Sequence, residues 1–283
     1  MTVPPIRCGG FRIEFGRRTL IVGIINMAPD SFAGDGLAAD ADAAEARGHE
    51  MRAAGADLLD IGGRSTRPGA PPVEVEEELR RTIPAIRRLA GIGVPVSVDT
   101  FSARVAAAGL DAGAVMVNDV SGLRADPGMA PLVSRTGVPV VVMDWDDRHG
   151  ARDVVQETAA FLRERIAAAA AAGIAETQIV VDPGYGFGLT LEQDFDILRR
   201  LRELAALGRP ILIGTSRKGS IGKVLHLPVH DRLEGTAATV VVAIMNGADM
   251  VRAHDVRAIS RVARMTDAIV RGGGSMNDSA ETT

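Results

Sequence analysis

The sequence predicts an α/β protein, a single (β/α)8 TIM barrel with a short N-terminal arm or hairpin. Eight short β-branched segments recur along the chain, and each ends in Gly or a polar residue. They are apolar throughout rather than alternating, as strands buried on both faces of a parallel sheet require. Helical segments separate them, and 283 residues suit one barrel of roughly 250 residues. The expected strands are 20–26, 57–62, 95–100, 115–119, 138–143, 178–182, 210–215 and 249–254.

Helices are expected between the strands, for example over 73–89 and 154–172, where Gly173 is placed to end the second helix. A doubly wound sheet is the alternative for such a βα alternation. No Pro-, Ser- or Gly-rich linker divides the chain internally, so one domain is expected. We therefore expect an arm or hairpin over 1–18, a barrel over 19–272, and a frayed tail over 273–283.

Composition excludes several classes of protein. The 46% hydrophobic content argues against a disordered chain, and the single cysteine, Cys8, argues against a disulfide scaffold. With 32 basic and 36 acidic residues the net charge is −4 and no basic cluster stands out, so a nucleic-acid partner is not expected. No apolar run is long enough to span a membrane, and no secretory signal is evident. We expect a soluble, cytoplasmic protein.

Polar residues collect at the carboxyl ends of the expected strands, where the active sites of such barrels lie. Carboxylates and amides can pair with a flat heterocycle that offers several N–H donors, whereas the cations suit phosphate or carboxylate. The sequence therefore predicts a two-ended pocket, with one half for an amino-substituted ring and the other for an anion. These residues are Asn26, Asp60, Asp99, Asn118, Asp119, Asp144, Asp182, Ser216, Arg217, Lys218, Arg252 and His254.

Two long loops rich in Gly and Pro follow the first two strands. They cover residues 27–36 and 62–72. Loops of this composition at the mouth of a barrel are candidate lids that close over a substrate and exclude water.

Five motifs stand in order along nearly the whole chain, from about residue 19 to 272. Each is weak alone, but their order and register together are highly specific, and they resemble the dihydropteroate synthase family, the sulfonamide target of folate synthesis. The motifs are Asn26-x-x-Pro29-Asp30-Ser31-Phe32, Asp60-Ile61-Gly62-Gly63-x-Ser65-Thr66-Arg67-Pro68-Gly69, Asp182-Pro183-Gly184-x-Gly186-Phe187-Gly188, Gly214-Thr215-Ser216-Arg217-Lys218 and Arg252-x-His254-Asp255-Val256.

The resemblance implies the condensation of 6-hydroxymethyl-7,8-dihydropterin pyrophosphate with p-aminobenzoate, with Mg²⁺ as cofactor. It implies a dissociative substitution in which pyrophosphate leaves before the aniline nitrogen adds. The matching positions place the pterin on Asp99, Asn118, Met143, Asp182 and Lys218. They place the pyrophosphate on Asn26, Arg252 and His254, with Asn26 also holding the metal. The implied lid and p-aminobenzoate residues are Phe32, Ser65, Thr66, Arg67, Pro68 and Gly219, and the implied catalytic residues are Asp35, Asp99, Lys218 and Arg252.

Several positions depart from the pattern usual in that family, none of them at the implied pterin contacts. The family's Ser at position 219 helps to hold the benzoate carboxylate, so backbone N–H groups or Ser220 would have to serve here. Arg64 reverses the charge of the usual Glu: either it strengthens anion binding or it points to solvent, which we favour. The departures are Ala28 for Thr, Arg64 for Glu, Asp144 for His, Leu189 for Lys, and Gly219-Ser220 for Ser-Phe.

Two alternatives stay open at this stage. One is a divergent pterin-binding paralogue without synthase activity, and the other is a pterin-dependent methyltransferase barrel. The methyltransferase is not expected to carry the Ser-Thr-Arg-Pro or Ser-Arg-Lys segments that this chain has. Apolar stretches over 237–245 and 259–269 could supply the face of a homodimer, the usual state of the resembled family.

Overall fold

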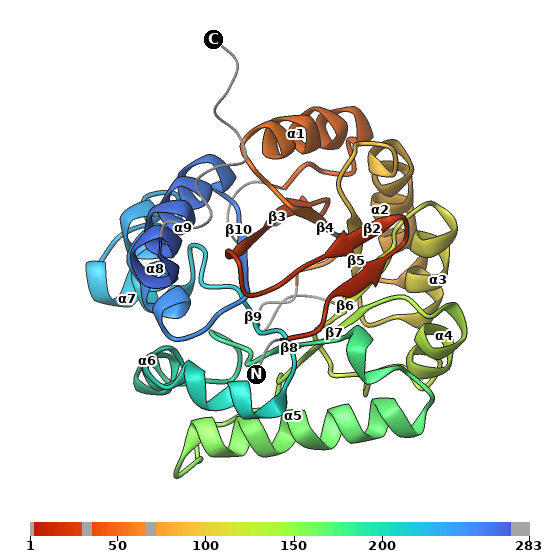
Figure 1. Cartoon of the computed structure of the whole chain (residues 1–283). Helices are drawn as coiled ribbons and strands as arrows, with labels where there is room; N and C mark the ends of the chain where they lie inside the picture. Colours follow the sequence, from red (N-terminus) through yellow and green to blue (C-terminus); the bar gives the residue numbers. More distant parts are fainter. Residues whose placement is uncertain (1–2, 30–35, 66–71, 273–283) are drawn as a thin grey trace.

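The computed structural model describes residues 3–29, 36–65 and 72–272. Within these ranges eight parallel strands form one sheet that curls into a barrel surrounded by helices (Figure 1). Every expected strand is present and lies within its predicted range, so the barrel prediction is confirmed and the doubly wound alternative is wrong. The strands are β3 (Leu20–Asn26), β4 (Leu58–Gly62), β5 (Val96–Asp99), β6 (Met116–Asp119), β7 (Val140–Met143), β8 (Ile179–Asp182), β9 (Leu212–Ile213) and β10 (Met250–Ala253).

The barrel closes around the strand order β8-β7-β6-β5-β4-β3-β10-β9. β3 pairs with β4 on one side and with β10 on the other, so the first and last strands of the barrel are neighbours. The joint between β8 and the β9 segment is made by a single parallel bridge between Val181 and Ile211.

Helices wrap the outside of the barrel and bury their apolar faces against the strands. The helix expected over 73–89 occupies 75–89, and the one expected over 154–172 ends at Ala171, with Gly173 in the left-handed region that lets the chain turn back. The helices are α1 (Ala41–Ala53), α2 (Val75–Leu89), α3 (Ala103–Asp111), α4 (Met129–Thr136), α5 (Val154–Ala171), α6 (Leu191–Arg199), α7 (Gly219–Leu225), α8 (Leu233–Met245) and α9 (Val256–Arg271), with 3-10 turns at η1 (Glu176–Gln178) and η2 (Leu201–Leu207).

An antiparallel hairpin of β1 (Ile6–Cys8) and β2 (Phe11–Ile13) covers one end of the barrel (Figure 1). Its Ile6 and Cys8 join a buried apolar cluster with residues at or near the start of the barrel strands, among them Leu20, Leu58 and Met250. Burial raises the pKa of the Cys8 thiol to about 12, as expected for an inert cysteine. The hairpin therefore closes the amino end of the barrel and leaves the carboxyl end for a site.

Successive side chains of a strand point alternately into the barrel and out of it, so every second residue faces the interior. On β3, Leu20 and Val22 belong to the cluster beneath the hairpin, while Ile24 and Asn26 line a cavity further along the barrel axis. The frayed tail expected over 273–283 lies outside the described residues. Within the described ranges, no helix is both long enough and apolar enough to cross a membrane.

Candidate active site

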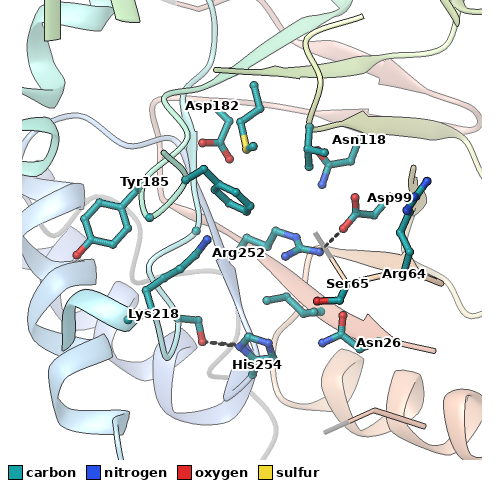
Figure 2. A pocket seen from close by; sticks show the side chains of 18 of the residues that line it. Asn26, Arg64, Ser65, Asp99, Asn118, Asp182, Tyr185, Lys218, Arg252 and His254 are labelled. Atoms are coloured by element: carbon teal, nitrogen blue, oxygen red, sulfur yellow. Dashed lines mark hydrogen bonds and ion pairs between the residues drawn. The ribbon is translucent and has the colours of Figure 1, made fainter. Parts of the chain in front are cut away.

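A cavity of about 310 Å³ opens at the carboxyl ends of the strands (Figure 2). Side chains from six strands and from the loops behind them meet there, including residues separated by more than 200 positions in the chain. The lining residues are Ile24, Asn26, Ala28, Arg64, Ser65, Asp99, Asn118, Val120, Met143, Asp182, Tyr185, Gly186, Phe187, Gly214, Ser216, Lys218, Gly219, Arg252 and His254.

The guanidinium of Arg252 lies between two buried carboxylates. Its Nε donates to Asp60 Oδ2 at 2.7 Å and its Nη2 donates to Asp99 Oδ2 at 2.8 Å (Figure 2 marks the second contact). Burial alone would lower the pKa of Arg252, but Asp60 and Asp99 outweigh it and raise that pKa above its usual value. Burial and the neighbouring Asp60 raise the pKa of Asp99 to about 7 against the opposing effect of Arg252.

Asp60, which the sequence predicts among the polar residues at the strand ends, does not itself line the cavity. It lies beneath the cavity, only 1% exposed, and its Oδ2 accepts from both Arg252 and the Asn118 side-chain amide, the latter at 2.9 Å. The Asp60 carboxylate thus contacts both Asn118, which the resemblance implies for the pterin, and Arg252, which it implies for the pyrophosphate. Among the described residues, Asp99 Oδ1 is buried without a hydrogen-bond partner, so it can accept from an N–H donor in the cavity.

Lys218 and Asp182 form the opposite wall of the cavity (Figure 2). The Lys218 ammonium lies 3.7 Å from the centre of the Phe187 ring, a cation–π contact. Burial lowers the pKa of Lys218 to about 8 although the carboxylates of Asp182 and Asp194 oppose the shift. Burial raises the pKa of Asp182 to about 6, against a hydrogen bond from the Gly184 N–H at 2.8 Å.

The turn after β8 requires glycine. Gly184 has φ +74°, and a Cβ there would lie 1.8 Å from the Asp144 carbonyl oxygen. Gly186 has φ +80°, and its Cβ would lie 2.9 Å from Cδ of Lys218. The motif Gly184-x-Gly186 therefore lets the chain pass close to Lys218 and present Phe187 to it.

His254 is held by the loop after β9. Its Nδ1 is hydrogen-bonded to Ser216 Oγ at 2.9 Å, and its backbone N–H donates to the same oxygen at 3.2 Å (Figure 2). His254 is 3% exposed and still lines the cavity, on the same side as Asn26. The imidazole is thus fixed at the end of the cavity for which the sequence predicts an anion.

The structure brings most of the predicted site residues that it describes into one cavity. Asp60, Asp119, Asp144 and Arg217 lie outside its lining, because protein groups hold their side chains, as Ser121 does for Asp119 and Arg148 for Asp144. Ser216, which the sequence predicts at this end of the barrel, also lines the cavity. Phe187 and Tyr185 line it without a predicted role, although Phe187 belongs to one of the quoted motifs. The predicted residues found in the lining are Asn26, Ser65, Asp99, Asn118, Met143, Asp182, Lys218, Gly219, Arg252 and His254. The predicted residues that lie outside the described ranges are Phe32, Asp35, Thr66, Arg67 and Pro68.

Arg64 does not point to solvent, and the orientation favoured from the sequence is wrong. Its side chain is 15% exposed, lies 3.9 Å from the centre of the Phe101 ring and pairs at 3.4 Å with Glu78, whose side chain is fully buried. Arg64 is drawn inward by Glu78 on α2, a buried carboxylate that a cation stabilises. Burial raises the pKa of Glu78, although Arg64 opposes the shift.

The other departures have structural partners. Asp144 is buried and pairs with Arg148 at 3.2 Å, Leu189 packs on the core, and Ala28 is buried at the cavity edge. The Ser220 hydroxyl is 2.6 Å from the hydroxyl of the buried Tyr185 and does not line the cavity, so only the Gly219 backbone of that pair does.

A model of the pterin binding enzyme family matches residues 22–254 of this chain. The dihydropteroate synthase of Clostridium beijerinckii is 43% identical over 268 residues, covering 94% of this chain and all of that protein. The solved Xanthomonas albilineans dihydropteroate synthase with 4-aminobenzoic acid is 42% identical with a TM-score of 0.88, covering 95% of this chain and 98% of that one. The Yersinia pestis dihydropteroate synthase with a sulfonamide drug complex has 35% identity and a TM-score of 0.90, covering 95% of this chain and all of that one.

Barrel, cavity and family model together define a pterin-binding enzyme. Within that class, the chain belongs to the dihydropteroate synthase family. Its activity is the condensation of 6-hydroxymethyl-7,8-dihydropterin pyrophosphate with p-aminobenzoate in folate biosynthesis, which yields 7,8-dihydropteroate and pyrophosphate. The comparisons favour this activity over that of a methyltransferase barrel.

The titrating groups of the cavity predict a bell-shaped pH profile for kcat/KM of the pterin substrate. The rate is expected to fall below about pH 6 to 7, as Asp182 and Asp99 become protonated, and above about pH 8, as Lys218 loses its proton. Lys218→Arg should move the alkaline limb upward because a guanidinium stays protonated. Steady-state rates between pH 5 and 10 provide the measurement, and an alkaline limb unmoved by the substitution would contradict it.

Proposed function

We propose that the ring of the pterin binds on the carboxylate side of the cavity, between Lys218 and Asn118. The observation that carries this proposal is the convergence of buried Asp99, Asn118 and Asp182 with Lys218 on one cavity. Carboxylate oxygens accept from ring N–H and amino groups, and Lys218 and the Asn118 amide supply donors for a ring carbonyl or nitrogen. Met143 contributes an apolar contact beside them. The pterin-binding unit is then the barrel over 19–272.

The pyrophosphate is proposed to lie against Arg252, His254 and Asn26, at the mouth of the same cavity. Among the described residues no cluster of three His, Cys, Asp or Glu side chains is placed to hold a metal ion. Mg²⁺ uses few protein ligands and takes the rest from substrate phosphates and water. Asn26, at the end of β3, offers the side-chain oxygen. Bound there, Mg²⁺ would neutralise part of the charge of the leaving pyrophosphate.

The reaction then needs positioning and charge stabilisation more than a strong base. The bond between the methylene carbon and pyrophosphate oxygen breaks, the electron pair leaves with pyrophosphate, and a resonance-stabilised cation stays on the pterin. Buried Asp99 and Asp182 stabilise that cation, while Arg252 and His254 stabilise the departing anion. The aniline nitrogen of p-aminobenzoate adds to the methylene carbon and then loses a proton, which its low basicity makes easy. Asp35, Thr66, Arg67 and Pro68 are proposed to act from the lids.

Assays of pyrophosphate release test these roles. Release is expected to require both p-aminobenzoate and Mg²⁺. Lys218→Ala should abolish pterin binding and turnover together, because it removes the ammonium group that is proposed to bind the ring. Lys223→Ala, at an exposed lysine on α7, is the matched control and should retain wild-type rates. Normal activity in Lys218→Ala would show that the site is misplaced. Pterin binding without acceptor-dependent release would favour the paralogue without synthase activity.

The acceptor p-aminobenzoate and its sulfonamide mimics are proposed to lie beside Gly219 and Ser65. The resembled family has a serine hydroxyl at position 219 for the benzoate carboxylate, and here Ser220 does not replace it because its hydroxyl contacts Tyr185. Nothing lies within 4 Å of a Cβ built on Gly219, and its φ is not in the left-handed region. A serine side chain therefore fits at this position without strain.

Gly219→Ser is expected to lower the KM for p-aminobenzoate and the inhibitory concentration of sulfonamides roughly three- to tenfold, the usual range for one added hydrogen bond. Gly219→Ala adds the Cβ without the hydroxyl, so it is the control for the added carbon. It should leave the KM for p-aminobenzoate and the inhibitory concentration of sulfonamides near those of the wild type. Rates and sulfonamide inhibition curves of the three proteins give the comparison. Equal gains in the serine and alanine variants would contradict a role for the hydroxyl.

We also propose a homodimer formed through α8 and α9. These helices lie side by side on the outside of the barrel (Figure 1) and expose large apolar side chains there. Met245 on α8 is 50% exposed, and Met265 and Ile269 on α9 are 64% and 71% exposed. A group of large apolar side chains exposed together on a protein surface marks an interaction face.

The double variant Met265→Glu/Ile269→Glu is expected to sediment as a monomer at micromolar concentration, since burying two carboxylates in an apolar interface is unfavourable. Ala160→Glu, which adds a charge at an exposed position of α5, serves as the control and should stay dimeric. Sedimentation equilibrium distinguishes the two states. A wild-type monomer, or a dimeric double variant, would rule out this face.

A further inference from the structure

Arg217 occupies an unusual backbone conformation directly before Lys218. Its φ is +56°, in the left-handed region that favours glycine. Such a conformation persists only where the surrounding structure holds it, and it recurs at functional sites. The loop between β9 and α7 carries Ser216, Lys218 and Gly219 into the cavity lining, whereas Arg217 does not belong to that lining.

The Arg217 side chain pairs with Asp255 in a bidentate geometry. Nε donates to Oδ2 at 2.9 Å and Nη2 donates to Oδ1 at 2.6 Å, and the two side chains are 17% and 24% exposed. Asp255 directly follows His254 in the loop after β10. Two parallel N–H···O bonds define the relative orientation of the groups they join, which a single contact does not do.

The backbone of Arg217 is held as well. Its N–H donates to Oγ1 of the buried Thr236 at 3.0 Å, and its carbonyl accepts from Arg232 Nη1 at 3.0 Å. The same Arg232 nitrogen lies 3.3 Å from the Lys218 carbonyl oxygen, and Arg232 Nε donates to the Leu227 carbonyl. Residues of α8 and of the turn before it therefore support the peptide units on both sides of Lys218.

The loops after β9 and β10 are consequently joined at two consecutive positions. Ser216 contacts His254, and Arg217 contacts Asp255. Lys218 follows one side of this double connection, and Arg252 precedes the other. The first loop carries Lys218, which is proposed to bind the pterin ring, and the second carries His254, which is proposed to bind the pyrophosphate.

We propose that Arg217 and Asp255 are positioning residues that hold the Lys218 loop in register with Arg252 at the end of β10 and with His254 in the loop after it. This inference rests on the roles proposed for Lys218, Arg252 and His254. The pair sets the spacing between the cation that binds the ring and the groups that bind the leaving pyrophosphate. Arg217, although part of the Ser-Arg-Lys motif, then acts on the substrate through Lys218 rather than by touching it.

A double-mutant cycle tests the pair. Arg217→Met and Asp255→Asn are each expected to lower kcat/KM for the pterin substrate by about ten- to a hundredfold, the scale of a small misplacement of binding groups. The double variant should be no worse than either single variant, because both remove the same contact.

Three further variants separate the pair from other roles. Asp255→Glu and Arg217→Lys, which keep the charges, should recover part of the lost rate. Arg217→Gly suits the left-handed backbone but lacks the side chain, so it should lose as much as Arg217→Met. Rates are measured well below the thermal midpoint of each variant, so that folding does not decide the result.

Several outcomes would overturn the proposal. If Asp255→Asn keeps the wild-type rate while Arg217→Met loses it, Arg217 contacts substrate directly. If Arg217→Gly is as active as the wild type, only the backbone conformation matters. Lys218→Ala, assayed in parallel, distinguishes failure of this proposal from failure of the proposed substrate site. Full activity of Lys218→Ala would rule out both. Loss of activity in Lys218→Ala, together with wild-type activity of the Arg217 and Asp255 variants, would rule out only the positioning role.

Discussion

The buried contact of Arg252 with Asp60 and Asp99 is the interaction on which the cavity depends. Burial and the neighbouring Asp60 raise the pKa of Asp99, and the guanidinium that contacts both carboxylates opposes that rise. Breaking such a buried arrangement by removing one partner costs about 3–5 kcal/mol in measured cases, because a charge is left uncompensated. Since Asp60 also holds Asn118, the same contact orients a residue on the neighbouring wall.

The barrel could be predicted from the sequence because its strands are continuous apolar segments that end in polar residues. The inward-facing polar residues at strand ends followed from the same pattern, which is why Asn26, Asp99 and Asp182 were assigned correctly to one cavity. The supporting role of Asp60 could not be predicted in this way. It depends on Arg252 of β10 reaching past β3 to β4, a contact between residues 192 positions apart.

Departures from the family pattern were harder to interpret, because their partners are distant in sequence. Arg64 is matched by Glu78 on the following helix, and the apolar surroundings that bury this pair exist only in the folded chain. Tyr185 and Ser220 contact each other across 35 positions, and no local pattern predicts that the small residue at 220 stands beside a large one at 185. Sequence indicates that such positions differ; the structure shows what each difference accommodates.

The single bridge between Val181 and Ile211 has a consequence for how this barrel responds to its substrate. Asp182 directly follows one side of that joint, and the β9 loop with Lys218 follows the other. A pterin ring that engages both side chains therefore connects the two edges of the sheet where the backbone connects them least. If the ring binds as proposed, the occupied protein would resist the separation of β8 from β9 more than the empty one.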